Sequence, residues 1–257
     1  MDFSVQAWKH SADAILSLDL TDEEWETPTD LPGWTARDVL AHLVHLERVL
    51  VVGDDQDVAG GGTTVQPDYT EAGVAARRHH PAGELRAELA ELVQARARAL
   101  TDLPEDGSQP APGTPGGVAW SLETLLRNRA FDMWVHEQDI RRAVGRPGNL
   151  DSPGAVLTTN MLAAALPIIV ARRAKAPAGA AVRVVVTGPV AVDTTIVVGE
   201  DGRARPGDAE PITTITMDTE TFTVLGTGRL TLADVTLEIA GDEPLGRTVA
   251  QHLNVAP

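Results

Sequence analysis

Asp132 and His136 are the two residues whose types and spacing point most directly to chemistry. They lie four positions apart in SLETLLRNRAFDMWVHEQDIRRAVG, residues 121–145, and this spacing stacks two side chains on one face of a helix. A carboxylate and an imidazole so placed can share one metal ion, and one imidazole from another helix, that of His42 or His45, can add a third ligand. Three protein ligands leave coordination positions open for water or substrate, as in catalytic metal sites.

The same residues also have simpler interpretations. An acidic residue and a histidine four positions apart on a helix are more often a surface ion pair or part of a cap. A lone buried histidine such as His42 is more often a hydrogen-bonded core residue. His45, three positions after His42, could support the site, replace a ligand or only pack against a loop. Trp34 and Trp134 are interpreted as anchors of the core or of loops rather than as platforms for substrate. Pattern alone leaves these alternatives open.

Composition limits the kind of site and the kind of partner. The chain has 257 residues and no cysteine, so a metal ion must bind to imidazole and carboxylate groups. A formal net charge of −16 argues against nucleic acid and anionic membranes as partners. The first residues lack the pattern of a secretory signal, and the apolar run around Pro167 looks too short to span a bilayer. We therefore expect a cytoplasmic protein.

The first part of the chain has the periodicity of helices. Thr35 and Asp38 form a capping-box pattern, Ser121 has the character of an N-cap, and Gly145 can end a helix. The Gly-rich segment 58–68 is expected to be a mobile surface loop. Long loops between the helices predict a four-helix bundle. The expected helices cover residues 2–20, 36–52, 82–100 and 121–145.

The last third of the chain predicts a second domain of the α+β class. Composition changes near residues 149–153, so we expect a helical domain over residues 1–150 and an α+β domain over residues 151–257. Its β-branched segments alternate with a period of two, which indicates an antiparallel sheet. The expected elements are a helix at 155–173, strands at 182–188, 191–199 and 213–228, and then a short helix, a strand and a closing helix within 230–253.

Two segments of the first domain resemble the hallmarks of the mycothiol-dependent maleylpyruvate isomerase family. They are LPGWTARDVLAHLVHLE at residues 31–47 and RNRAFDMWVHEQDIRRAVGRPG at residues 127–148. The segment from Phe222 to Leu253 is similar to the C-terminal domain of that family. The resemblance extends over nearly the whole chain. It implies a DinB-like metal-binding four-helix bundle followed by a domain related to the sterol-carrier-protein fold.

The resemblance also assigns roles to individual residues. It implies that His42, Asp132 and His136 are the metal ligands. The family more usually has Glu at the acidic position, so the shorter Asp132 would draw the ion toward its own helix or bind it less tightly. Arg229, in GTGR, matches an arginine that the family places near its active site, with a catalytic and cofactor-binding role. Apart from the resemblance, Arg141 and Asp139 are expected to make structural ion pairs near the end of their helix, although Arg141 could instead face an anionic ligand such as the cofactor.

The activity implied by the resemblance depends on a metal ion and a thiol. Zinc is the expected ion, although nickel, iron or manganese would also suit these ligands. The thiol in relatives is mycothiol, the low-molecular-weight thiol of actinobacteria, which would attack a small electrophilic substrate in an isomerase or S-transferase reaction. Two other functions stay open, a non-enzymatic small-molecule binding protein and a metal-dependent hydrolase. The protein is expected to be a monomer or homodimer.

Overall fold

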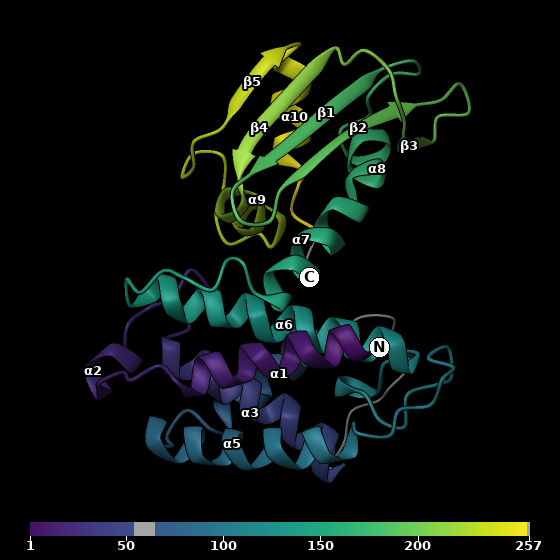
Figure 1. The fold of residues 1–257 in the computed structure, drawn as a ribbon. Helices are drawn as coiled ribbons and strands as arrows, with labels where there is room; N and C mark the ends of the chain where they lie inside the picture. The colour runs from purple at the N-terminus through teal and green to yellow at the C-terminus, as the bar shows by residue number, and fades with distance from the viewer. Residues whose placement is uncertain (54–64, 256–257) are drawn as a thin grey trace. The chain divides into compact units, whose positions relative to one another are not determined.

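The computed structural model describes residues 1–53 and 65–255. The chain divides into two compact units, the first formed by residues 1–148 with 152–157 and the second by residues 149–151 with 158–257. Helices build the first unit, and a five-stranded sheet with helices builds the second (Figure 1). The predicted α+β fold with a helical part followed by a sheet is therefore confirmed. The segment 58–68, expected to be a mobile loop, lies largely outside the described residues.

Helices of very different length make up the first unit. The four longest of those described correspond to the four predicted from periodicity, whereas the short α2 and α4 were not predicted. The elements are α1 (Asp2–Leu16), α2 (Asp22–Trp25), α3 (Ala36–Val52), α4 (Pro67–Ala75), α5 (Ala82–Ala99), the 3₁₀ turn η1 (Pro115–Gly117) and α6 (Leu122–Ala143).

Local capping sets where the two helices that carry the candidate ligands begin. The Thr35 hydroxyl accepts a hydrogen bond from the Asp38 amide at 3.3 Å, and the Asp38 carboxylate accepts one from the Thr35 amide at 3.0 Å. Ser121 caps α6 by accepting a hydrogen bond from the Thr124 amide at 3.2 Å. Gly145, with a φ of 64°, follows the end of α6. The caps at Thr35 and Ser121 satisfy amides that the first turn leaves unpaired. The predictions for Thr35 with Asp38, for Ser121 and for Gly145 are confirmed.

α3 is the most enclosed of these helices. It packs against α4, α5 and α6, while α1 packs against α5 and α6. Most residues of α3 are buried, including Asp38, His42 and Glu47. A helix that buries polar groups must offer them partners, because an unpaired buried charge is strongly destabilising. The partners of these residues define the site described below.

The second unit places helices on one face of its sheet. The valines at 182, 184 and 186 are buried, and the intervening side chains are more exposed. α8, η2 and α10 pack on the strands (Figure 1). The elements are α7 (Pro153–Ala164), whose first five residues belong to the first unit, α8 (Leu166–Ile168), the π-helical turn η2 (Ile169–Arg173), β1 (Ala181–Thr187), β2 (Val192–Val198), β3 (Ala204–Pro206), β4 (Thr213–Asp218), α9 (Thr219–Gly226), β5 (Glu238–Gly241) and α10 (Glu243–Gln251).

The sheet is mixed, which corrects the prediction of a purely antiparallel sheet. Its strand order is β3-β2-β1-β4-β5, and β1 pairs with β4 in parallel while the other neighbours are antiparallel. β3 ends with Pro206 opposite Ile196, which itself pairs with Val182 near the start of β1. Residues 207–212 carry the chain to the other side of β1 at that same end. β4 must therefore run in the direction of β1.

The strand predicted over residues 213–228 was wrong in its second half. β4 ends at Asp218, whose carboxylate accepts a hydrogen bond from the Thr221 amide at 2.7 Å and caps α9. The threonines favour a strand, but the N-cap at Asp218 and the burial of most residues of α9 outweigh this strand propensity. The short helix expected after Leu230 is absent from this described part of the chain, whereas β5 and α10 match the expected strand and closing helix.

One apolar segment is longer than predicted. Among the described residues, Pro153–Arg173 forms a helix that is long and apolar enough to cross a membrane by length and composition, and half of it is buried inside the protein. The sequence analysis judged the apolar run too short to span a bilayer and broken by Pro167. α7 does end shortly before this proline, at Ala164, and Pro167 lies in the first turn of α8, where proline is tolerated. Because a buried core helix passes the same test, the segment is weak evidence for a membrane.

Candidate metal centre

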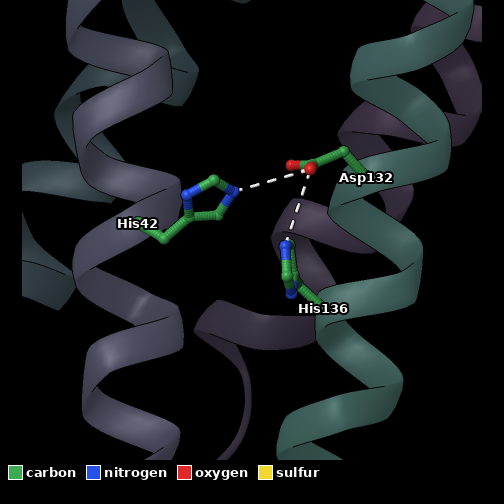
Figure 2. A group of neighbouring side chains, drawn as sticks. All are labelled: His42, Asp132 and His136. Atoms are coloured by element: carbon green, nitrogen blue, oxygen red, sulfur yellow. Dashed lines mark ion pairs between the residues drawn. The ribbon is translucent and has the colours of Figure 1, made fainter. Parts of the chain in front are cut away.

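His42, Asp132 and His136 meet between two helices of the first unit. His42 comes from α3, and Asp132 and His136 lie one turn apart on α6 (Figure 2). The Oδ1 of Asp132 is 3.5 Å from the Nε2 of His42 and 3.5 Å from the Nε2 of His136. One ligand atom from each residue lies within 4.8 Å of the other two. The structure thus brings together the three residues that the sequence analysis selected.

These distances fit a divalent ion. Ligand atoms about 2.1 Å from a tetrahedral zinc ion are about 3.4 Å from one another. The two 3.5 Å separations around Oδ1 of Asp132 match that spacing. The donor set of two imidazoles and one carboxylate suits zinc and neighbouring transition metals. The side chains could accept such an ion with little movement.

His42 is buried without a hydrogen-bond partner. Neither of its ring nitrogens makes a hydrogen bond among the described residues, although buried polar atoms nearly always have a partner. Burial lowers the pKa of His42 to about 4, more than Asp132 raises it. The imidazole is therefore neutral at pH 7, and an ion bound beside Asp132 could accept the lone pair of Nε2. An unsatisfied neutral imidazole is what a metal ligand requires.

His136 is oriented by a second carboxylate. Its Nδ1 lies 2.9 Å from Oδ2 of Asp139, a residue fully buried in α6. Arg142 donates to the other oxygen of Asp139 at 2.7 Å. Burial lowers the pKa of His136, but the nearby Asp132 and Asp139 outweigh this effect, so its pKa is raised. A carboxylate behind a histidine is a recurrent support for metal-binding imidazoles.

Asp132 is itself held by an arginine. Arg129 Nη1 donates to Oδ2 of Asp132 at 2.6 Å, and Arg129 Nη2 donates to Oε1 of Glu47 at 2.8 Å. Burial raises the pKa of Asp132, but Arg129 above all, with His136 and His42, holds it well below its ordinary value. The carboxylate is therefore ionised. Its Oδ1 is left to face the two imidazoles.

Trp34 forms part of the wall of the site. Its ring centroid is 5.4 Å from that of His42 and 6.4 Å from that of His136. The indole is only partly buried, and its Nε1 donates to Oε2 of Glu71 at 3.0 Å. The sequence analysis favoured Trp34 as an anchor over Trp34 as a platform for substrate. Its contact with both imidazoles adds it to the site.

Three other residues considered from the sequence lie outside this group. The His45 ring packs 5.1 Å from Tyr69 of α4, with its Nδ1 3.4 Å from Arg77. Arg141, in the last turn of α6, donates to the buried carboxylate of Glu137 at 2.6 Å. Arg229 belongs to the second unit, where its Nη1 donates to the carbonyl of Thr227 at 2.9 Å. The cofactor-binding roles of Arg141 and Arg229 stay predictions.

Comparison with known families supports the assignment made from sequence motifs. The model of the mycothiol maleylpyruvate isomerase N-terminal domain matches residues 6–141, more than half of the chain. The chain belongs to the mycothiol maleylpyruvate isomerase family. The model of the C-terminal domain of the same family matches residues 158–248. The family resemblance predicted from the two N-terminal segments is confirmed.

Solved structures of the family share the fold. The crystal structure of the mycothiol-dependent maleylpyruvate isomerase aligns with a TM-score of 0.54 and 16% identity, over 93% of this chain and 92% of the other. A histidine-to-alanine mutant of that isomerase aligns with a TM-score of 0.51, 16% identity and the same coverage. No curated protein sequence matches the chain. At this identity the likeness establishes the common fold and nothing finer.

The sequence analysis gave none of the residues behind the ligands a supporting role, although it expected Asp139 to form a structural ion pair. Arg129, Asp132, His136 and Asp139 follow one another at intervals of three, four and three, which places them on one face of α6. Arg129 and Asp139 lie on this face on either side of the candidate ligands. Their charges and spacing could have predicted that they support the ligands. Glu47 gave no comparable signal, because its partners come from other helices. Only tertiary packing shows what it contacts.

Proposed function

We propose that this member of the family is a metal-dependent enzyme that uses a small thiol, mycothiol, in an isomerase or S-transferase reaction on a small electrophilic substrate. The observation that carries the proposal is the meeting of His42, Asp132 and His136 within 4.8 Å in a chain of this family. Zinc is the expected ion, with nickel, iron and manganese as alternatives. We place the enzyme in the cytoplasm, where small thiols are kept reduced.

The side chains of the site have complementary tasks. A divalent ion bound there would supply Lewis acidity that lowers the pKa of a coordinated thiol. His42 can bind without first losing a proton, because burial already keeps it neutral. Asp132 supplies one negative charge, so the centre keeps a net positive charge that favours an anionic sulfur. Since the chain has no cysteine, the nucleophilic sulfur must arrive with the cosubstrate.

The proposed reaction begins with addition of the thiolate and ends with either its expulsion or protonation of the adduct. The thiolate sulfur adds to an electron-poor carbon of a conjugated double bond, and the π pair moves onto the conjugated carbonyl oxygen. The remaining single bond can rotate, and expulsion of the thiolate restores the double bond, which gives net isomerisation. If the carbon of the intermediate instead takes up a proton from water, which replaces the proton that the thiol lost on ionisation, the carbon–sulfur bond persists and the outcome is S-transfer. We propose that Arg229 and Arg141 bind anionic groups of the thiol or substrate.

A metal-dependent hydrolase is the second candidate, because three protein ligands would equally allow an ion to activate water. Thiol dependence distinguishes the two reactions. Titration of mycothiol, followed by thiolate absorbance in the ultraviolet, should show a lowered thiol pKa only when protein and metal are both present. An unperturbed thiol pKa with metal-loaded protein would reject thiol activation and favour the hydrolase. A protein that takes up no metal would favour the non-enzymatic small-molecule binder.

Elemental analysis tests the metal site itself. The wild type should bind about one divalent ion per chain, and His42→Ala and His136→Ala should each lose it. His10→Ala is the matched control, because His10 is an exposed histidine of α1 outside the group. It should retain the metal content of the wild type. Equal metal content in all four proteins would refute the proposed site.

A further inference from the structure

The two oxygens of Asp132 have different surroundings. Oδ1 faces the Nε2 atoms of His42 and His136, each 3.5 Å away (Figure 2). Oδ2 accepts a hydrogen bond from Arg129 Nη1 at 2.6 Å. A carboxylate can bind a metal ion through one oxygen or through both. The arginine therefore bears directly on how Asp132 can bind an ion.

Arg129 is held rigidly on its other side. Its Nη2 donates to Oε1 of Glu47 at 2.8 Å, and the two side chains are 3% and 0% exposed. Glu47 also accepts hydrogen bonds from Trp8 Nε1 at 2.9 Å and from Arg96 Nη1 at 2.7 Å. Trp8, Glu47, Arg96 and Arg129 come from α1, α3, α5 and α6, respectively. One buried carboxylate thus ties the guanidinium of Arg129 to all four long helices.

The charges of this network balance. Two guanidiniums, Arg96 and Arg129, face two carboxylates, Glu47 and Asp132. Balanced, hydrogen-bonded charges can remain buried, whereas a single unpaired charge there costs several kcal/mol. Glu47 and Arg96 already form a complete pair at 2.7 Å. Glu47 therefore does not need Arg129 as its only cationic partner. The hydrogen bond from Arg129 to Asp132 calls for an explanation other than neutralising Glu47.

We propose that Arg129, anchored by Glu47, is a positioning residue that occupies Oδ2 of Asp132 so that this side chain binds the metal ion through Oδ1 alone. The inference rests on the proposed metal site. A carboxylate with both oxygens available would take a second coordination position, one that thiol or substrate needs. The planar guanidinium suits this task, because its two amino groups reach two carboxylates in a fixed geometry. A lysine ammonium keeps the positive charge but has no two amino groups at a fixed spacing that could bind both carboxylates.

Cobalt(II) absorption tests the inference with a readout that does not depend on activity. Four-coordinate cobalt absorbs visible light more strongly than cobalt with a higher coordination number, such as the five that a two-oxygen carboxylate would produce. Wild-type protein loaded with Co²⁺ should show the stronger absorption, and Arg129→Lys should show weaker bands and bind Co²⁺ about 10- to 100-fold less tightly. Arg183→Lys is the matched control, since Arg183 forms a two-hydrogen-bond pair with Asp193, exposed in the second unit. It should match the wild type.

The outcomes separate this inference from the proposed function. Wild-type protein that binds no Co²⁺ would overturn the metal site and the inference together. Wild-type binding with the same spectrum and affinity in folded Arg129→Lys would overturn the inference alone. If Arg129→Lys does not fold, as judged by circular dichroism, Arg129→Met replaces it, because this variant leaves the buried pair of Glu47 and Arg96 intact. Arg129→Met should show the same weakening of the cobalt bands, and an unchanged spectrum would likewise reject the role of Arg129.

Discussion

Asp139 determines which nitrogen of His136 faces the candidate metal centre. The Nδ1 of His136 lies 2.9 Å from Oδ2 of Asp139, and an ionised carboxylate can only accept hydrogen bonds. Nδ1 must therefore carry the hydrogen. In the neutral imidazole this leaves the lone pair on Nε2, the atom 3.5 Å from Asp132. Arg142 fixes Asp139 in turn through a 2.7 Å hydrogen bond.

Asp139→Asn should weaken metal binding without removing a ligand. Arg142 would retain the amide oxygen as its acceptor, so the amide NH₂ would face Nδ1 of His136. The imidazole would then carry its hydrogen on Nε2, where the ion requires a lone pair. We expect metal affinity to fall by about 10- to 100-fold, measured by competition with a chromophoric chelator. Asp193→Asn, at an exposed carboxylate, is the control. Unchanged affinity in Asp139→Asn would show that Asp139 does not set the tautomer.

Trp34 should report metal binding by its fluorescence. Its ring lies 5.4 Å from His42 and 6.4 Å from His136, so Co²⁺ in the site would quench it efficiently. Titration with Co²⁺ should lower the tryptophan emission of the wild type, and Trp34→Phe should lose the largest part of that change while still binding the ion. The chain has five tryptophans, which makes this comparison necessary. Full quenching in Trp34→Phe would place the ion elsewhere.

Glu47→Gln should change how stability depends on pH. Burial raises the pKa of Glu47, but Arg96 and Arg129 outweigh it, so the pKa is lowered on folding. A lowered pKa stabilises the folded state above the ordinary glutamate value of about 4.3, and this stabilisation is lost as the pH falls through the folded-state value. Glu47→Gln should therefore lose about 3–5 kcal/mol of the free energy of unfolding at pH 7, and less at pH 4.

Urea unfolding followed by tryptophan fluorescence measures this difference. All the tryptophans, at positions 8, 25, 34, 120 and 134, lie in the first unit, so the signal reports the unit that contains Glu47. Arg183→Gln removes one partner of an exposed ion pair in the second unit and should leave the transition unchanged. A difference between wild type and Glu47→Gln that does not shrink on acidification would contradict the ionised state assigned to Glu47.

Two glycine substitutions should have opposite effects on stability. A Cβ at Gly73 in α4 would lie 2.1 Å from Cδ2 of His45, so Gly73→Ala should destabilise by about 1–3 kcal/mol through overpacking. Gly83 in α5 has nothing within 4 Å of such a Cβ, and Gly83→Ala should stabilise by up to about 1 kcal/mol through helix propensity. Thermal unfolding measures both changes. Stabilisation by Gly73→Ala would show that His45 is not packed as described.

Much of the candidate site can be predicted from the sequence, because it depends on helical spacing, helix capping and composition. Asp132 and His136 share a helix face because four residues make about one turn. Thr35 and Ser121 begin their helices because their hydroxyls accept hydrogen bonds from amides within the first turn. The absence of cysteine restricts a metal ion to imidazole and carboxylate ligands. Each of these conclusions depends on residues only a few positions apart.

The other features depend on which elements meet in space. His42 is 90 positions from Asp132, and Glu47 is 82 positions from Arg129, so no helical spacing relates them. β1 and β4 are parallel because residues 207–212, which connect β3 to β4, cross from one side of β1 to the other at the end where β1 begins. The end of β4 at Asp218 depends on the packing of α9 as well as on the cap. The sequence by itself determined the kinds of ligand and the helices that carry them. Tertiary structure decided their convergence and the buried charges behind them, because burial and long-range contacts, rather than local periodicity, set the partners of a charged side chain.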